Sequence, residues 1–417
     1  MTPRPGTLSP LDAPAVPAPR RLRSALSLDH LFGSLGLFTV FPVLGLLLAA
    51  RAPGSGTAVV GAGLFCYTAS AGLAALALNR WLHRVGYRTG MAGGVLLSAV
   101  AFGSLPYAGT AWALCALLVL AGTGVSVHFT LSRVLIAEVV HDSIGRNRIF
   151  SLFQIAVNAG ATLGPFVANL LYTDSDPRLL MGFVALCYLA AGAVMLPGIP
   201  SHRRPPATSG TWPVSRAVLL RVVRTPAMLR LVVVSTLGTF VYAQFYSAFA
   251  LSVGRDFESA AARSVLIAAP AVSIVLFQTA VTALISKLMA AGKTPFAVLG
   301  RANILFGVSM LLLGVGLPPL FGAGVAVLVF ALAEMMFAPM MSTAFAGLGV
   351  GSSLEVMHLR QVCWSTGEAL GSLAGGSLFL MLHDAGEAWL YWDVLGVVTL
   401  VCTGLLAFLI RPGTART

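Results

Sequence analysis

The chain has 417 residues, of which 57% are hydrophobic and only 10% are charged, whereas soluble domains carry about a quarter charged residues. This composition excludes a soluble globular protein and indicates a polytopic membrane protein. The formal charge of +12 would suggest nucleic-acid binding in a soluble chain, so its distribution along the sequence decides what it means.

Apolar segments of about 20 residues are long enough to cross the hydrocarbon core of a bilayer as helices. The first half of the chain holds six such segments, at 28–50, 57–79, 90–108, 111–137, 149–172 and 179–198. The second half holds six more, at 229–253, 264–290, 295–317, 320–346, 358–382 and 389–410. The sequence therefore predicts an all-α polytopic membrane protein with 12 transmembrane helices.

Hydrophilic stretches divide these helices into two groups. Residues 1–25, rich in Pro and Ala, are predicted to be a disordered tail because they cannot bury a core. The Arg- and Pro-rich stretch at 199–227 is predicted to link a first six-helix bundle at 26–198 to a second at 228–411. Residues 412–417 form a short C-terminal tail.

The cations fall on one side of the predicted membrane. With the N-terminus in the cytoplasm, most of the 26 Lys and Arg residues lie in cytoplasmic segments, and only Arg51, Arg178, Arg255 and Arg263 lie outside. The positive-inside rule therefore predicts a multi-pass protein of the cell membrane with both termini cytoplasmic. The basic charge is then a topology signal, and nucleic acid is not an expected partner.

Several classes of chemistry lack their motifs here. The five cysteines lie in apolar runs, with no CxxC spacing and no His cluster of metal-ligand type nearby. No Walker A, HExxH or GxSxG motif is present. We therefore expect no metal, no cofactor and no enzymatic activity.

A glycine motif occurs twice, half the chain apart. Gly160 and Gly164, followed by Pro165, lie in the fifth segment; Gly371 and Gly375 follow Gly367 in the eleventh. Glycines four residues apart let a neighbouring helix approach closely, and a proline permits a bend. The motif suits either static packing or two helices that rock on each other, and its repetition indicates two pseudo-symmetric bundles.

These residues resemble those of a twelve-helix Major Facilitator Superfamily transporter of the drug:proton antiporter type, over roughly residues 25–410. Leu35-Gly36 and Pro42-Val43 are similar to the first-helix signature of that family, and Gly160, Gly164 and Pro165 to its fifth-helix antiporter motif. The loop containing Arg84, Gly86 and Arg88 is similar to its signature loop. The likeness extends to single-component bacterial multidrug exporters of the inner membrane, and it implies a monomer.

The resemblance implies alternating access and export of a hydrophobic or amphipathic small molecule in exchange for protons. Several positions depart from the family pattern, and two of them bear on the mechanism. His83 stands where the signature loop has an Asp, and Leu118 stands where the fourth helix has an Arg that is implicated in proton coupling. An uncoupled permease for a specific metabolite therefore remains the alternative, with a membrane-embedded enzyme as a remote one.

Ionisable side chains in a bilayer are costly and are functional candidates by default. Glu334, in the tenth segment, could load a proton from one side and release it on the other, or hold a neighbouring helix. Glu368, beside the second glycine motif, could couple protons or make a buried bond between helices. Asp29 could exchange protons or cap its helix after Ser27.

Other polar and aromatic residues are candidates for the cavity wall or for gating. Arg133, near the cytoplasmic end of the fourth segment, is expected to snorkel or to pair with Glu138 at a gate. The candidate cavity residues are adaptable, aromatic or polar side chains that core packing or lipid contact would equally explain. They are Met336, Met340, Tyr242, Gln244, Phe245, Asn158 and Gln278.

Overall fold

The computed structural model describes residues 20–51, 56–172, 176–206 and 212–408. The predicted tails therefore lie outside the described residues, except for 20–25. These are helical, because α1 starts at Arg20, so the tail prediction is wrong for them.

The described part of the first half folds entirely into helices and short turns. Most of its long helices begin and end close to the predicted segments, because a bilayer-length apolar run sets their extent. The exceptions are α1, which begins eight residues before its predicted segment, and α6, which begins six residues before. They are α1 (Arg20–Arg51), α2 (Gly56–Ala77), α4 (Tyr87–Ser104), α5 (Ala111–Val139), α6 (Ser143–Leu171) and α7 (Arg178–Met195), with the short α3 (Asn79–Leu82) and a 3-10 turn at Leu105–Tyr107.

The second half repeats this plan with two interruptions. Single π-helical turns, Phe245–Phe249 and Ala374–Leu378, divide two of its spans. The helices are α8 (Arg216–Arg224), α9 (Pro226–Gln244), α10 (Ala250–Asp256), α11 (Ala260–Ala290), α12 (Pro295–Gly314), α13 (Pro319–Ala346), α14 (Ser353–Leu373), α15 (Phe379–Asp384) and α16 (Ala388–Phe408).

Eleven helical spans of the described chain are long and apolar enough to cross a membrane. The remaining predicted segment, 358–382, corresponds to α14, its π turn and α15. This segment is not among the eleven apolar spans, and its helix α14 carries three charged residues, Glu355, Arg360 and Glu368. The chain is thus an all-α, multi-pass membrane protein.

Local sequence fixes where several of these helices start. The Asp142 carboxylate accepts a hydrogen bond from the backbone N–H of Gly145 at the start of α6. Ser352 and Glu355 form a reciprocal capping box at the start of α14. Such caps satisfy backbone N–H groups that have no partner within the helix.

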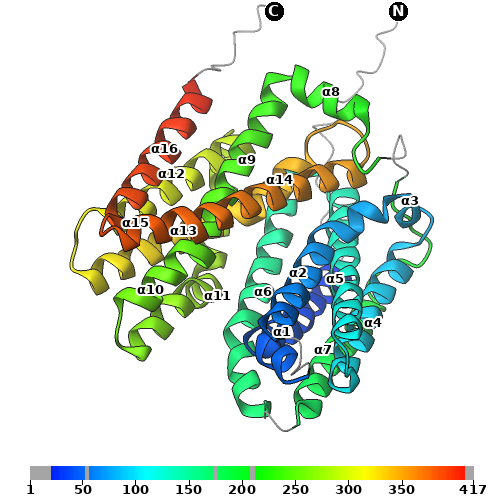
Figure 1. The fold of residues 1–417 in the computed structure, drawn as a ribbon. Helices are drawn as coiled ribbons and strands as arrows, with labels where there is room; N and C mark the ends of the chain where they lie inside the picture. The colour runs from blue at the N-terminus through cyan, green and yellow to red at the C-terminus, as the bar shows by residue number, and fades with distance from the viewer. Residues whose placement is uncertain (1–19, 52–55, 173–175, 207–211, 409–417) are drawn as a thin grey trace, which may run out of the picture.

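The helices gather into two groups, one on each side of Figure 1, with α1 to α7 in one group and α9 to α16 in the other. In the first group α1 packs along α6, and in the second α9 packs along α14. The repeated glycines lie at these two contacts. A Cβ at Gly160 would lie 2.7 Å from the Leu35 nitrogen, and one at Gly164 would lie 2.5 Å from the Phe38 carbonyl carbon.

The contact between α9 and α14 is equally close. A Cβ at Gly371 would collide with the Phe240 carbonyl oxygen, and one at Gly375 with the Ser247 hydroxyl. Both halves therefore bring two backbones together through glycines.

The two groups pack on each other where α6 lies against α11 and α13. They also come together on the side of the molecule that carries α8, which we call the α8 side (Figure 1). There the Ser353 hydroxyl, at the start of α14, donates a hydrogen bond to the Glu138 carboxylate near the end of α5. The segment before α8 adds to this closure. Asn79 donates to the Trp212 carbonyl at 3.3 Å, and the Ser215 nitrogen donates to Glu355 at 3.2 Å.

The signature-like loop between α3 and α4 packs on the stretch that follows α7. The Tyr87 nitrogen donates to the Arg203 carbonyl at 3.1 Å, and Gly86 lies against the same carbonyl. Arg84 is exposed and lies over the Trp81 ring, and Arg88 is half-buried. Neither arginine makes an ion pair within the part of the chain that the structure describes.

Candidate functional site

A cavity of about 990 Å³ lies between the two groups of helices. Its wall is built by α1, α5 and α6 from the first half, with Ala71 of α2, and by α9, the π turn Phe245–Phe249, α11, α13 and α14 from the second. Sites for drug-sized molecules usually have volumes of about 300–1,000 Å³. The cavity is therefore large enough for such a molecule.

The cavity opens on the side opposite α8. Its lining reaches Asn169, close to the end of α6, and Arg263, close to the start of α11. Towards the α8 side the lining stops at Arg133, Ser342 and Arg360. Beyond these residues the bond between Ser353 and Glu138 joins the two halves.

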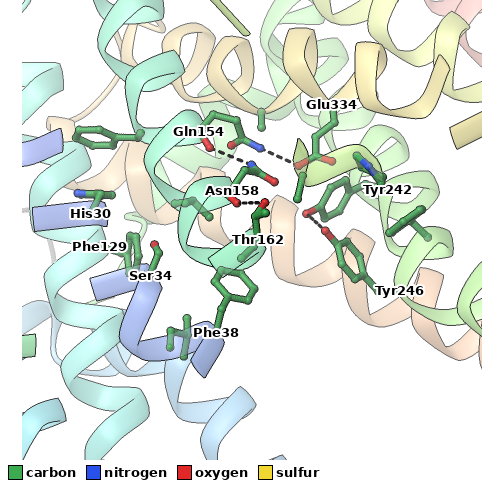
Figure 2. A pocket seen from close by; sticks show the side chains of 18 of the residues that line it. His30, Ser34, Phe38, Phe129, Gln154, Asn158, Thr162, Tyr242, Tyr246 and Glu334 are labelled. Carbon is green, nitrogen blue, oxygen red and sulfur yellow. Dashed lines mark hydrogen bonds between the residues drawn. The ribbon is translucent and has the colours of Figure 1, made fainter. Parts of the chain in front are cut away.

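Glu334 projects into the cavity from the middle of α13 and is 2% exposed. Gln154, on α6 in the other half, donates a hydrogen bond from Nε2 to Glu334 Oε1 at 2.7 Å (Figure 2). The other carboxylate oxygen, Oε2, is buried and has no hydrogen-bond partner among the residues that the structure describes. A single carboxyl group therefore connects the two halves across the cavity.

Aromatic side chains form much of the wall around this bond. Tyr242 and Tyr246 share a hydroxyl–hydroxyl hydrogen bond of 3.1 Å on one side, and Asn158 and Thr162 face them from α6 (Figure 2). The other aromatic lining residues are Phe38, Phe129, Phe150, Phe153, Phe166, Phe245 and Trp364. The predictions of Tyr242, Phe245 and Asn158 as cavity residues thus coincide with the lining.

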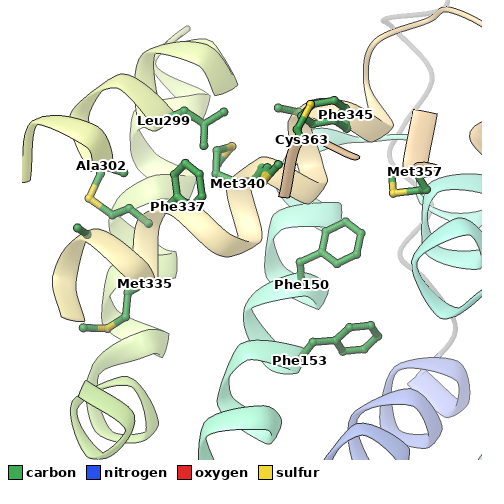
Figure 3. Packing of buried hydrophobic residues seen from close by; sticks show 14 of the residues in the cluster. Phe150, Phe153, Leu299, Ala302, Met335, Phe337, Met340, Phe345, Met357 and Cys363 are labelled. Carbon is green, nitrogen blue, oxygen red and sulfur yellow. The ribbon is translucent and has the colours of Figure 1, made fainter. Parts of the chain in front are cut away.

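Two methionines predicted for the cavity lie elsewhere. The lining residues of α13 are Glu334, Ala338 and Ser342, which are spaced by four and share one helix face. Met336 and Met340 occupy another face and pack in the hydrophobic core, where Figure 3 shows Met340 beside Phe337. The cavity prediction is therefore wrong for both methionines. The alternative prediction, that they pack in the core, is the one that the structure supports.

Two glutamines predicted for the cavity instead tie helices together. Gln244 accepts a hydrogen bond from the Tyr391 hydroxyl at 2.6 Å and donates to the Gly371 carbonyl at 3.0 Å. Gln278 donates to the Met335 carbonyl at 3.0 Å. Both are fully buried away from the cavity, because a long amide side chain in an apolar bundle is stabilised by carbonyls of neighbouring helices.

Glu368 is exposed and does not line the cavity. It accepts a hydrogen bond from Trp364 Nε1 at 3.0 Å, one turn earlier on the same helix. The prediction that Glu368 makes a buried hydrogen bond between helices is therefore wrong. The Gly367 stripe occupies the face of α14 that packs on α9, and Glu368 points to another face.

Asp29 is buried well inside α1, which begins at Arg20, so its interpretation as a helix cap is wrong. Its Oδ2 lies 2.7 Å from Nε2 of His128 on α5 and 3.5 Å from Nδ1 of His30. The three side chains could together hold a metal ion. The sequence pattern did not reveal this cluster, because His128 lies on a distant segment of the chain.

His30 connects this cluster to the cavity wall. Its ring stacks on Phe153 with the centroids 3.7 Å apart, and its Nδ1 lies 2.9 Å from the Leu26 carbonyl. A hydrogen bond to a backbone carbonyl places the ring proton on Nδ1. That nitrogen is then a donor, and the Asp29 carboxylate is the acceptor for His128.

Arg133 does not pair with Glu138, which is bonded by Ser353 instead. It lines the deep end of the cavity, where its guanidinium lies 5.6 Å from the centre of the Phe129 ring. Arg360, which the sequence did not single out as a site residue, lines the same end from α14. The signal that could have identified Arg360 is its position in a predicted membrane segment that is less apolar than the neighbouring segments.

The profile of the Major Facilitator Superfamily matches residues 26–372 of the chain. The multidrug resistance protein MdtH of Aeromonas salmonicida is 27% identical over 409 residues, which cover 95% of this chain and 98% of that protein. The MdtH protein of Aeromonas hydrophila is equally similar, with the same coverage.

Two solved structures share the fold. The human organic anion transporter MFSD10 superposes with a TM-score of 0.71 at 18% identity, covering 93% of this chain and 99% of that one. A POT family transporter in complex with a thioalcohol-conjugated peptide gives a TM-score of 0.68 at 13% identity, covering 92% and 95%.

Proposed function

The chain belongs to the Major Facilitator Superfamily, and from this premise we propose that it exports an amphipathic or hydrophobic small molecule in exchange for protons. The observation that carries the proposal is the cavity between the two halves, with its aromatic wall and its bond between Gln154 and Glu334. The similarity to proteins named for multidrug resistance supports the same substrate class.

Glu334 is the proton carrier in this proposal. When ionised it accepts the Gln154 hydrogen bond and holds α6 and α13 together across the cavity. When protonated it is neutral, so the electrostatic part of that contact is lost. A proton can thereby change the relative stability of the two openings, which is what exchange requires. Asp29, which lies 2.7 Å from His128, is the second proton-coupling candidate near the same wall.

We place the α8 side in the cytoplasm of a bacterial inner membrane, because most arginines and lysines lie in segments of that side. The cavity then opens outward in this structure. The protein acts as a monomer, without enzymatic activity, and its partners are the substrate, protons and lipid. Alternating access requires a second state in which the α8 side opens.

Leu118 supports one alternative, an uncoupled permease for a specific metabolite. It is fully buried in the apolar core of the first half and does not line the cavity. The membrane arginine that the antiporter family has at that position is therefore not available here for coupling. A saturable flux that ignores the proton gradient would favour this alternative.

The test is accumulation of a fluorescent lipophilic dye by inverted membrane vesicles energised by respiration, with and without an uncoupler. The matched control is vesicles from the same strain without the protein. We expect protein-dependent accumulation that collapses when the uncoupler is added. Accumulation that persists with the uncoupler would reject proton exchange, and no flux of any dye or metabolite would reject the transporter assignment.

A further inference from the structure

The deep end of the cavity carries two arginines, one from each half of the protein. Arg133 comes from α5 and Arg360 from α14, and both line the cavity. Their helices pack against each other, so both arginines lie at the same end of the cavity. The nearby His30 and Ser342 belong to the same end.

No carboxylate neutralises either arginine within the described residues. The ion pairs of that part of the chain involve Asp29, Asp176, Asp256 and Asp384, and none of them includes Arg133 or Arg360. Glu334, the carboxylate on the cavity wall, is hydrogen-bonded by Gln154. Two cations without a counter-ion in a poorly solvated site attract an anion strongly.

Arg360 is held in place for such a role. It is only 4% exposed, and its Nε donates to the Ser342 hydroxyl at 2.9 Å. Its guanidinium carbon lies 5.3 Å from the centre of the Trp364 ring. Of its N–H groups, Nε is the one with a hydrogen-bond partner in the described structure, so the two terminal nitrogens are free to bind an acceptor.

We infer that this pair, Arg133 and Arg360, is a binding site for the acidic group of an amphipathic organic anion. A carboxylate or sulfonate oxygen accepts hydrogen bonds from guanidinium groups with good geometry. The apolar body of the same molecule would lie against Phe129, Phe153 and Trp364, which line the cavity beside the arginines. The substrate class of the proposed exporter is thus anionic rather than cationic.

The site also explains how substrate affects the two halves. Arg133 and Arg360 belong to helices that must separate when the α8 side opens. Their mutual repulsion favours separation, and an anion between them opposes it. Binding therefore stabilises the state that is closed on the α8 side, the state that this structure represents.

The remaining charges on the wall agree with an anionic ligand. Arg263, near the open end, donates to the carbonyls of Phe257 and Glu258 at 2.7 and 3.0 Å, and its guanidinium still adds positive charge to the entrance. Among the described residues, the cavity wall thus has three arginines and one glutamate. Such an arrangement attracts anions into the cavity.

This inference rests on the proposed function, and a binding experiment separates the two. The purified protein in lipid nanodiscs is titrated against fluorescein, an anionic xanthene dye, and against tetramethylrhodamine methyl ester, a cation with the same ring system. Fluorescence polarisation reports binding of each. We expect the wild-type protein to bind fluorescein at least about tenfold more tightly, the factor that one charge-assisted hydrogen bond supplies.

Variants then locate the site. Arg133→Gln and Arg360→Gln are each expected to weaken fluorescein binding about tenfold or more, with Arg360→Lys intermediate. Arg301→Gln is the matched control, because Arg301 donates to the Ala297 carbonyl of its own helix and does not line the cavity. Size-exclusion profiles identify any variant that fails to fold. If a variant fails, the relative affinity of the wild-type protein for fluorescein and for the cationic dye tests the inference.

Equal or tighter binding of the cation by the wild-type protein would overturn the inference, as would fluorescein binding that neither Gln variant weakens. Anion binding without any transport would leave the site standing and reject the proposed export instead.

Discussion

At the residue scale, Glu334 is the side chain on which the proposed proton exchange depends. Among the described residues that line the cavity it is the one carboxylate, and it is fixed by Gln154 from the opposite half. An acid in an apolar segment is costly, so its position alone marked it as a candidate. Its partner was harder to predict, because Gln154 lies on a distant segment and one sequence shows no pairing between helices.

Glu334→Gln keeps the size and hydrogen-bonding ability of the side chain but cannot exchange a proton. We therefore expect proton-driven substrate accumulation to fall to background, while exchange of labelled for unlabelled substrate continues. Glu368→Gln is the matched control and should retain accumulation, because within the described chain Glu368 bonds to Trp364 of its own helix and does not line the cavity. Full accumulation by the Glu334 variant would remove this residue from the coupling mechanism.

At the element scale, the lengths of the helices follow from the sequence but their faces do not. Apolar runs gave the extent of α13 closely, since bilayer thickness sets it. However, α13 is apolar around its whole circumference, so no periodicity distinguishes the Glu334, Ala338 and Ser342 face from the methionine face. The sequence therefore does not show that Met336 and Met340 face the core and not the cavity.

The glycine contacts at this scale are testable by adding one methyl group. Gly164→Ala places a Cβ 2.5 Å from the Phe38 carbonyl carbon, so α1 and α6 must move apart. Overpacking of this kind costs about 1–3 kcal/mol, and we expect a lower melting temperature and reduced transport.

Gly182→Ala, on α7, is the matched control, because a Cβ there meets nothing within 4 Å. Its melting temperature should match that of the wild-type protein. Equal thermal stability of the two variants, measured by thermal unfolding of the purified proteins, would contradict the close α1–α6 contact.

At the scale of the whole molecule, the repeated glycine motif predicted two pseudo-symmetric halves, but the sequence did not reveal which side is closed. A transporter of this kind has at least two states with the same sequence. Composition and residue spacing are therefore compatible with both states and do not show which side is closed. The structure shows the state that is closed on the α8 side, with Ser353 bonded to Glu138 and the segment at 212–215 bridging the halves.

Covalent closure of the α8 side should stop transport. We expect that Glu138→Cys with Ser353→Cys, in a variant whose native cysteines are replaced, becomes inactive when a short bifunctional thiol reagent joins the pair. Rigid-body separation of the halves is then blocked. Each single-cysteine variant is the control and should stay active with the reagent. Undiminished flux through the cross-linked protein would show that this side need not open.

The most direct test of proton-coupled export uses the purified protein in liposomes, where no other pump or enzyme contributes. An outwardly or inwardly directed proton gradient is imposed, and movement of an amphipathic dye is followed by fluorescence in wild-type and Glu334→Gln liposomes. We expect dye to accumulate in the compartment from which protons leave, and the direction of accumulation to reverse when the gradient is reversed. The Glu334→Gln variant should lose this response. Dye movement that is the same under both gradients would contradict proton-coupled export.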